Sequence, residues 1–313
     1  MSKITNVWVF SDVLARLAEV IGGAHELGEK VTALVIGSNE DVALAFNYGA
    51  DEVFHLGEAN SEKIIESYAK TIASVINANE KSLVLMPGTK RCKALASLLG
   101  VELNAGVVTE VSVVTVEDDT VKCKHMVYGG LAISEEAIKS NVAIAVVAGG
   151  AFATVEADSA KSGKAKVVDF VESVTSIKCI ERRAKECSSV DLNKAKHIVA
   201  IGRGIAKQED IKIAEELCFV MGAELGCSRP IAEGEKWMAH ERYIGISSVI
   251  AKPDIYFAIG ISGQIQHMVG AKDSQTIIVI NKDKNAPIFD YADYGIIGDL
   301  YKVVPAVVRA LKG

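Results

Sequence analysis

The stretch PDIYFAIGISGQIQH at residues 253–267 decides the fold of the second half of the chain. Its apolar run Ile255–Ile259 predicts a buried strand. The glycines after that run predict a tight turn, and Ser262 is a suitable N-cap for a helix that begins near Gln264. A strand, a glycine turn and a helix N-terminus together predict an anion-binding site, because free backbone N–H groups and the helix dipole face the same point.

A second apolar run at residues 276–280 predicts a neighbouring parallel strand, which ends at Asn281. Ligands of open α/β sheets bind at the carboxyl ends of the parallel strands. We therefore expect one crevice at that edge, on which four polar side chains converge: Ser262, Gln266, His267 and Asn281.

His267 has two interpretations when it is taken alone. A histidine in this pattern is commonly a helix-surface or core residue. Its neighbours Ser262 and Gln266 favour the alternative, in which the imidazole donates a hydrogen bond to an oxygen of a bound ring. Asp293 and Asp299 also have two interpretations, because a carboxylate there can accept from a ribityl or ribose hydroxyl or can cap a turn.

The preceding segment repeats the strand–glycine pattern. Residues 196–201 predict a strand that runs into Gly202-Arg203-Gly204, and residues 210–221 predict a helix that ends at Gly222. The third glycine of the dinucleotide fingerprint is absent, so a cofactor-binding turn and an ordinary strand–helix turn both stay open. Arg229 precedes Pro230, which predicts an extended backbone; its guanidinium would face a planar anionic ligand or simply lie on the surface.

The first half of the chain alternates strands with helices, which predicts a doubly wound, mostly parallel α/β sheet. The predicted strands are 6–10, 30–36, 52–56, 82–86, 109–116, 120–128, 142–147 and 165–171, and the predicted helices are 13–29, 40–48, 61–79 and 90–99. The strands after Val107 have little helix between them, so we expect a mixed or antiparallel extension there. The polar, basic segment 177–191 predicts a linker, and we place an N-terminal domain at 1–185 and a C-terminal domain at 186–313.

Composition excludes several classes of protein. The 313 residues carry a formal net charge of -6, whereas a nucleic-acid-binding protein is usually basic. There is no run of 18 apolar residues and no signal-peptide pattern, so we expect a cytoplasmic protein with no integral membrane segment. The six cysteines form no CxxC or His-paired spacing, which predicts free thiols in a reducing cytoplasm and no metal. We find no catalytic triad and no paired carboxylates, so the site is expected to hold a ligand and tune its electrostatics.

Four motifs occur in a fixed order, and together they resemble the alpha subunit of the electron transfer flavoproteins. They are Ser228-Arg229-Pro230, the segment 260–267, Ile280-Asn281-Lys282-Asp283 and the segment 286–295. The segments 126–130, 237–238 and 242–245 are similar to the FixB branch of that family, which is linked to anaerobic carnitine or acyl-CoA metabolism or to nitrogen fixation. The resemblance spans essentially the whole chain.

The resemblance implies an electron carrier that is not an enzyme on its own. A heterodimer with a beta subunit, contacted by the N-terminal domain, would hold FAD in a Rossmann-like, DHS-type C-terminal domain. Its redox partner would be an acyl-CoA dehydrogenase-type protein or a ferredoxin- or quinone-linked one, in fatty acid beta-oxidation or carnitine metabolism. Electron bifurcation would require a second flavin in the beta subunit.

The resemblance also implies the cofactor-binding residues. Arg203 would meet the phosphate–ribose region, while Ser262 and Gly263, followed by Gln264 and Ile265, would cradle the pyrophosphate. Ser228 and Arg229 would lie at the flavin, and Gln266 and His267 would reach the isoalloxazine, with His267 on its O2 side. Asn281 would lie at the adenosine end, with Asp299 and Leu300 near the adenine.

One segment departs from the family pattern. Where the family usually has Gly-Gln-Thr-Gly, this chain has Gly245-Ile246-Ser247-Ser248. Ser247 still offers a hydroxyl toward flavin N5, but Ile246 removes the amide, so the redox tuning of the flavin is expected to differ. Two other hypotheses stay open: a stand-alone NAD(P)-dependent oxidoreductase, motivated by Gly202-x-Gly204, and a nucleotide-binding module with a degenerate flavin site, motivated by Ile246.

Overall fold

The chain folds into two compact units. The structure, a computed structural model, describes residues 2–59, 62–173, 177–181 and 190–313. One unit comprises Met1–Val127 and Ile133–Arg183, and the other comprises Tyr128–Ala132 and Ala184–Gly313. Residues 182–189 lie outside the described residues. The domain boundary predicted after residue 185 falls on them, and so does most of the linker predicted at 177–191.

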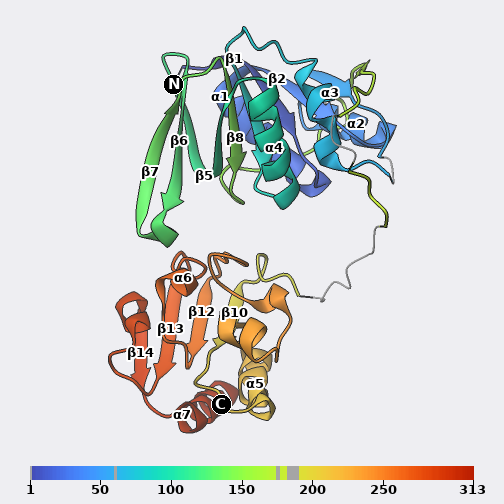
Figure 1. Ribbon diagram of the computed structural model, residues 1–313. Coiled ribbons are helices and arrows are strands. Elements are labelled where there is room, and N and C mark those ends of the chain that lie inside the picture. The colour runs from blue at the N-terminus through green and yellow to red at the C-terminus, as the bar shows by residue number, and fades with distance from the viewer. Residues whose placement is uncertain (1, 60–61, 174–176, 182–189) are drawn as a thin grey trace. The chain divides into compact units, whose positions relative to one another are not determined.

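The N-terminal unit is built on a nine-stranded sheet with the order β7-β6-β5-β8-β4-β1-β2-β3-β9 (Figure 1). The strands are β1 (Ile4–Phe10), β2 (Gly28–Val35), β3 (Glu52–His55), β4 (Ser82–Pro87), β5 (Gly106–Glu117), β6 (Thr120–Val127), β7 (Ala132–Ile138), β8 (Val142–Val147) and β9 (Lys166–Val167). The pairs from β5 through β8, β4, β1, β2 and β3 to β9 are parallel, whereas β5 and β6 pair antiparallel. The mixed sheet with an antiparallel extension is therefore confirmed.

Both faces of this sheet are covered, because its central strands carry buried apolar side chains on both sides. In β1, Val7 and Val9 pack on one side while Trp8 and Phe10 pack on the other, as alternation along a strand requires. Helices α1 (Leu17–Leu27) and α2 (Asn39–Asn47) cover the first side, and α3 (Ala69–Ala73) and α4 (Lys90–Glu102) cover the second (Figure 1). Single helical turns occur at η1 (Leu14–Arg16), η2 (Ile65–Tyr68) and η3 (Tyr128–Gly130).

Two predicted helices of this unit have different bounds in the structure. The helix predicted at 61–79 is only η2 followed by α3, because the Ser74 hydroxyl donates to the carbonyl of Thr71 (2.7 Å) where α3 ends. The helix predicted to stop at Gly100 continues to Glu102. Gly100 serves close packing instead, since a Cβ there would lie 2.6 Å from Cγ2 of Val107.

Two strand predictions also differ from the structure. Only Lys166–Val167 of the predicted strand 165–171 pairs with the sheet. The residues after it turn onto the helical layer, where Phe170 packs edge-on against Tyr68. Strand β7 was not predicted, because five of its seven residues are exposed and it has no apolar alternation.

The C-terminal unit contains a five-stranded, all-parallel sheet with the order β11-β10-β12-β13-β14. Its strands are β10 (His197–Ile201), β11 (Glu224–Cys227), β12 (Ile255–Ile259), β13 (Thr276–Asn281) and β14 (Tyr294–Ile297). Its helices are α5 (Ile211–Met221), α6 (Ile265–Met268) and α7 (Leu300–Lys312), with single turns at η4 (Gln208–Asp210), η5 (Pro230–Gly234), η6 (His240–Arg242) and η7 (Pro287–Tyr291). A parallel five-stranded sheet of this kind confirms the predicted Rossmann-like fold class.

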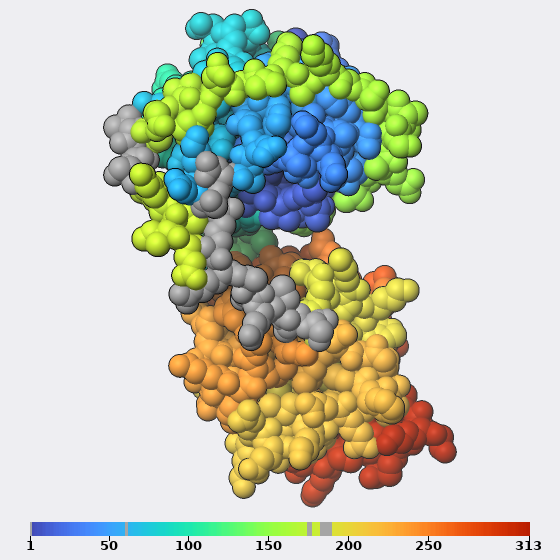
Figure 2. Space-filling model, turned by 90° about the vertical axis from the view of Figure 1, so that its right-hand side faces the viewer, coloured from blue at the N-terminus to red at the C-terminus, as the bar shows by residue number. Residues whose placement is uncertain are grey.

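The two faces of this sheet are covered differently. Val199 and Ile201 of β10 face α5 and α7, which lie side by side on the surface of this unit (Figure 2). Ile198 and Ala200 face a layer made mostly of irregular chain, which includes Ile244, Met268 and Ile288. The predicted site residues from 245 to 267 therefore belong to a layer with little regular structure, where side-chain position depends on individual contacts.

Glycines allow two strand ends of this sheet to touch through their backbones. A Cβ on Gly202, just after β10, would lie 2.4 Å from the carbonyl oxygen of Gly260, just after β12. A Cβ on Gly204 would lie 2.6 Å from Cα of Gly260, and the N–H of Gly204 donates to the carbonyl of Gly260 (3.0 Å). The Gly-x-Gly pair is therefore explained by packing, which removes the motive for an NAD(P)-binding turn.

We predict that Gly202→Ala destabilises the C-terminal unit by at least about 2 kcal/mol, because a backbone oxygen cannot move aside as a side chain can. The measurement is the free energy of unfolding from urea titration followed by circular dichroism. Gly234→Ala is the matched control, since a Cβ there meets nothing within 4 Å. Equal stability of the two variants would contradict the packing argument.

Candidate functional site

One group of predicted site residues lies at the carboxyl edge of the C-terminal sheet. Arg203 is exposed directly after the contact between Gly202 and Gly260. Asn281 ends β13, and its amide nitrogen donates to the carbonyl of Ile261 (2.8 Å). Leu300 begins α7 and is buried, with its Cδ2 3.2 Å from the position that a Cβ on Gly204 or Gly260 would take. These residues of β10, β12, β13 and α7 lie close together at this edge of the sheet.

The chain after Gly260 differs from the prediction in its helix. Ser262 is exposed and does not cap α6; the N-cap is Gln264, which makes no side-chain capping bond. The carbonyl of Ser262 accepts from the N–H of Ile288 (3.1 Å), and Gly263 has a φ of 87° that favours glycine. These contacts keep residues 261–264 out of a helix, so α6 begins only at Ile265 and its four residues have too little aligned backbone to act as a dipole.

His267 is buried against the sheet. Its Nε2 forms a 2.7 Å hydrogen bond with the hydroxyl of Tyr256, the second residue of β12, and the imidazole is only 7% exposed. Its Nδ1 is buried and has no hydrogen-bond partner among the described residues. Burial lowers the pKa of His267 from 6.5 to about 4, although the backbone of Ile244 partly opposes the shift. The histidine is therefore neutral at physiological pH.

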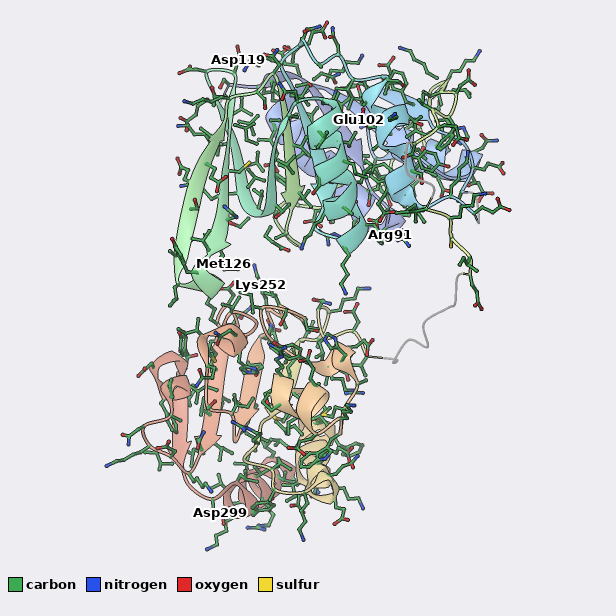
Figure 3. The ribbon with its side chains drawn as sticks, viewed as in Figure 1. Arg91, Glu102, Asp119, Met126, Lys252 and Asp299 are labelled. Atoms are coloured by element: carbon green, nitrogen blue, oxygen red, sulfur yellow. The ribbon has the colours of Figure 1, made fainter. Side chains whose placement is uncertain are left out.

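The expectation that four side chains share one crevice is not met, because the chain runs back along the sheet after Gly260. Asn281 contacts Ile261 at the carboxyl end of the strands, whereas His267 contacts Tyr256 near the amino end of β12. In Figure 3, Lys252 and Asp299 mark these two ends of the unit. The predicted residues are therefore divided between the carboxyl edge, where Arg203 and Asn281 lie, and the Tyr256 side of β12, where His267 lies.

A second tyrosine holds the segment that departs from the family pattern. The hydroxyl of Tyr243, whose side chain is buried, lies 3.1 Å from Oγ of the exposed Ser247. The N–H of Ile246 donates to the carbonyl of Gln266 (2.8 Å), which joins this loop to α6. Gly245 has a φ of 154°, and a Cβ there would lie 2.8 Å from the Tyr243 hydroxyl. Ser247, Gln266 and His267 are thus brought together by backbone contacts.

Ser228 and Arg229 follow β11 in a conformation that was not predicted. Arg229 has φ and ψ of -48° and -46°, which is helical, because the N–H groups of Ile231 and Ala232 donate to the carbonyl of Ser228 (3.0 and 3.4 Å) and so include Arg229 in the turn that leads into η5. Its guanidinium is exposed and pairs with Glu233 (Nε to Oε2, 2.5 Å). Ser228 is buried, and its N–H donates to the carbonyl of Ile201 (2.9 Å). The carbonyl of the preceding Cys227 accepts from the N–H of Ile244, which links this segment to the loop at residues 243–248, called the Tyr243 loop below.

Both aspartates of the last motif stabilise backbone. Oδ2 of Asp293 accepts from the N–H of Ile277 (2.8 Å), and Asp299 caps α7 by accepting from Tyr301 (3.0 Å). The capping interpretation therefore accounts for one oxygen of each carboxylate. The other oxygen of Asp299 stays at an exposed position.

Sequence reasoning missed a cavity of about 550 Å³ in the same unit. It lies between α5, β11 and η6, and its lining includes Ile211, Lys212, Glu224, Trp237, Met238 and Arg242. None of the predicted cofactor-binding residues lines it. The signal available in the sequence was Trp237 with Arg242 and Tyr243 in the loop after Pro230, a set that could cover a ring or simply pack.

The described cysteines behave as inert thiols. Cys92, Cys123, Cys179, Cys218 and Cys227 are free. Burial raises the pKa of Cys92, Cys123, Cys218 and Cys227 to about 12, so these four stay protonated. No helix among the described residues is long and apolar enough to cross a membrane.

Two family models match the chain in the order of its two units. The "Electron transfer flavoprotein domain" matches residues 15–173, and the "Electron transfer flavoprotein FAD-binding domain" matches residues 191–272. The first covers the nine-stranded sheet apart from β1, and the second covers β10 through α6 with the Tyr256–His267 pair. The chain therefore belongs to the electron transfer flavoprotein family, and the cofactor of its C-terminal unit is FAD.

Curated relatives narrow the assignment. "Protein FixB" of Salmonella typhimurium is 48% identical over 312 residues, which cover 99% of each chain. "Protein FixB" is 48% identical in Escherichia coli O6:K15:H31 and 47% identical in Escherichia coli O7:K1, with the same coverage. Within the family, the chain is an alpha subunit of the FixB type.

The residues present fit FAD. A buried nitrogen without a partner, as at His267, calls for a group from outside the chain. Exposed donors follow the chain toward it, at Ser262, Gln264 and Gln266. The donors along residues 262–267 are neutral, and those at Arg203 and Arg229 are cationic. Such a set suits a ligand with a phosphate part and a ring part.

We predict that burial of neutral His267 makes folding depend on pH. The folded protein binds this proton only below about pH 4, whereas the unfolded chain binds it below 6.5, so stability contributed by the neutral form is lost as the pH falls through that window. The loss is at most about 3 kcal/mol. Urea titrations at pH 7.5 and pH 5 should show a smaller pH dependence for His267→Gln than for the wild type.

The control is His125→Gln, which removes a histidine from the hairpin of the other unit. The assignment of the effect to His267 is contradicted if both variants keep the pH dependence of the wild type.

Proposed function

We propose that the chain carries electrons as one subunit of a heterodimer: it binds FAD together with a beta subunit and exchanges electrons with an acyl-CoA dehydrogenase-type protein. The observation that supports this most is the buried, unpartnered Nδ1 of His267 within a unit of the FAD-binding family. A ferredoxin- or quinone-linked partner is the alternative for the other end of the transfer. From the resemblance to the FixB branch, we place the protein in cytoplasmic carnitine or fatty acid beta-oxidation metabolism.

We assign the carboxyl-edge cluster to the phosphate and adenosine parts of the cofactor. Arg203 would neutralise phosphate charge, and Ser262 and Gly263 would hold the pyrophosphate. Asn281 uses one of its two amide protons on Ile261 and keeps the other for the adenosine end. Asp299 and Leu300 would border the adenine, with one oxygen of Asp299 engaged at its own helix.

We assign the remaining residues to the ring system. Ser228, Gly245, Ser247, Gln266 and His267 are joined by backbone hydrogen bonds between β11, the Tyr243 loop and α6. FAD supplies the redox chemistry when it is bound, and the chain supplies orientation and charge. Neutral donors and the Arg229 guanidinium would favour negative charge on the ring, which raises the potential at which it accepts an electron. Gln264 and Ile265 connect the two assigned regions.

Arg229 would have to leave Glu233 to face the ring. Their contact is exposed, and exposed ion pairs contribute little to stability, so release of the guanidinium would cost little. This arrangement supports a mobile cation at the ring better than a fixed one.

The central test is cofactor content. Co-expression with the beta subunit should give a yellow complex with a flavin spectrum and about one FAD per pair. A colourless pair that cannot be reconstituted with FAD would overturn the proposal and would favour the degenerate-site hypothesis raised by Ile246.

We predict that Gln266→Ala weakens FAD binding to the pair by about tenfold, the loss expected when one hydrogen bond of roughly 1.4 kcal/mol is removed. Titration of the FAD-free pair with FAD, followed by fluorescence, measures the dissociation constant. Gln208→Ala, at an exposed position in η4, is the control and should leave the constant unchanged. A Gln266→Ala pair that binds as tightly as the control would remove Gln266 from the site.

A further inference from the structure

We propose that Tyr256 is a positioning residue for the flavin site: it holds His267 in the tautomer with the proton on Nδ1, so that Nδ1 is the nitrogen that donates to the bound cofactor. Only the second part of this inference, the donation from Nδ1 to the cofactor, rests on the proposed function. The tautomer itself is a property of the polypeptide and can be measured without FAD.

Tyr256 and His267 are hydrogen-bond partners of each other. Tyr256 is completely buried in the sheet, and its hydroxyl lies 2.7 Å from Nε2 of His267. Both side chains lie in the layer that also contains Ile244 and Met268. Among the described residues, the tyrosine hydroxyl has no other hydrogen bond and Nδ1 has none. Two polar side chains therefore share one hydrogen bond in an apolar setting.

Counting protons selects one arrangement. A neutral imidazole carries one N–H, and a phenol carries one O–H. If Nε2 carried the proton and donated to Tyr256, then the phenol proton and the Nδ1 lone pair would both be buried without a partner. If Tyr256 donates to Nε2, only the Nδ1 proton is left over. Each unpaired buried polar group is unfavourable, so the second arrangement, which leaves one such group in place of two, is preferred.

The charge states agree with this arrangement. Burial raises the pKa of Tyr256 and lowers that of His267 to about 4, so the phenol keeps its proton and the imidazole stays neutral. The backbone of Ile244 partly opposes the shift in the pKa of His267. The choice of tautomer rests on the proton count above, and these charge states supply the neutral imidazole and phenol that it assumes.

The consequence is a donor whose direction is set by the sheet. Tyr256 belongs to β12, which is paired on both sides with β10 and β13, so its hydroxyl has little freedom to move. A bond from that hydroxyl prevents the imidazole from rotating by 180°. His267 would then present a neutral N–H to an electron-rich acceptor without having to gain a proton.

The test uses the heterodimer with 15N-labelled histidine, free of FAD. Protonated and unprotonated imidazole nitrogens have well separated 15N chemical shifts, so the spectrum reports the tautomer directly. We expect His267 to show a protonated Nδ1 and an unprotonated Nε2 in the wild type. A protonated Nε2 there would overturn the proposal, and no variant is needed for that outcome.

Tyr256→Phe removes only the hydroxyl and should move His267 toward the Nε2-protonated tautomer. Tyr294→Phe is the matched control, because Tyr294 is 66% exposed on β14, and it should keep the wild-type tautomer. An unchanged tautomer in Tyr256→Phe would contradict the positioning role.

The flavin half is tested on the FAD-loaded pair by spectroelectrochemistry. The first midpoint potential should shift to more negative values in Tyr256→Phe and should not shift in Tyr294→Phe. If the pair binds no FAD, the proposed function fails while the tautomer result still stands. If FAD binds and the potential is unchanged, the link between Tyr256 and the cofactor is wrong.

Discussion

The backbone contact between the ends of β10 and β12 controls the shape of the C-terminal unit. Gly202 and Gly204 approach Gly260 more closely than any side chain allows, and the left-handed φ of 63° at Gly260 turns the chain there. The chain then runs back along one face of the sheet without regular structure and enters helix α6 only at Ile265. Because of that return, residues 262–267 lie along one face of the sheet and do not gather at its edge.

This path explains how a fold with short strands can serve a long cofactor. The carboxyl edge supplies Arg203, Asn281 and the start of α7, and the opposite end supplies His267 on Tyr256. In a common dinucleotide-binding fold, the first strand–helix turn does most of the phosphate binding. Here the equivalent glycines are used for packing, so we expect the contacts to FAD to be spread along residues 203–300 and to consist of many weak donors.

Two buried tyrosines are the polar supports of the ring region. Tyr243 contacts Ser247, and Tyr256 contacts His267, so each of these side chains is oriented by a phenol from the protein interior. The loss of the usual amide at Ile246 leaves this pair of supports in place. We infer that the proposed flavin site of this chain lacks one donor and keeps its overall construction.

The regular strands and helices could be predicted well from the sequence, whereas the irregular layer at residues 245–267 could not. Strand β12 and helix α5 were predicted because apolar periodicity and the cap glycine Gly222 are local signals. Strand β7 had no such signal, since it is mostly exposed. Arg229 and Ser262 were misassigned because their backbone is fixed by contacts distant in sequence: Ser262 by Ile288, and the turn after Arg229 by its packing on the sheet. The Tyr256–His267 pair could not have been predicted, because a tyrosine in an apolar strand predicts only a core side chain.

A structure of the heterodimer with FAD bound would test the central claim most directly. Our account predicts that the cofactor lies along the line from Asp299 to His267, with a flavin oxygen within hydrogen-bond distance of Nδ1 of His267 and with Nε2 still on Tyr256. The account would be contradicted if FAD lay elsewhere, for example in the cavity beside Trp237 and Arg242, or if Nδ1 of His267 made no contact with it.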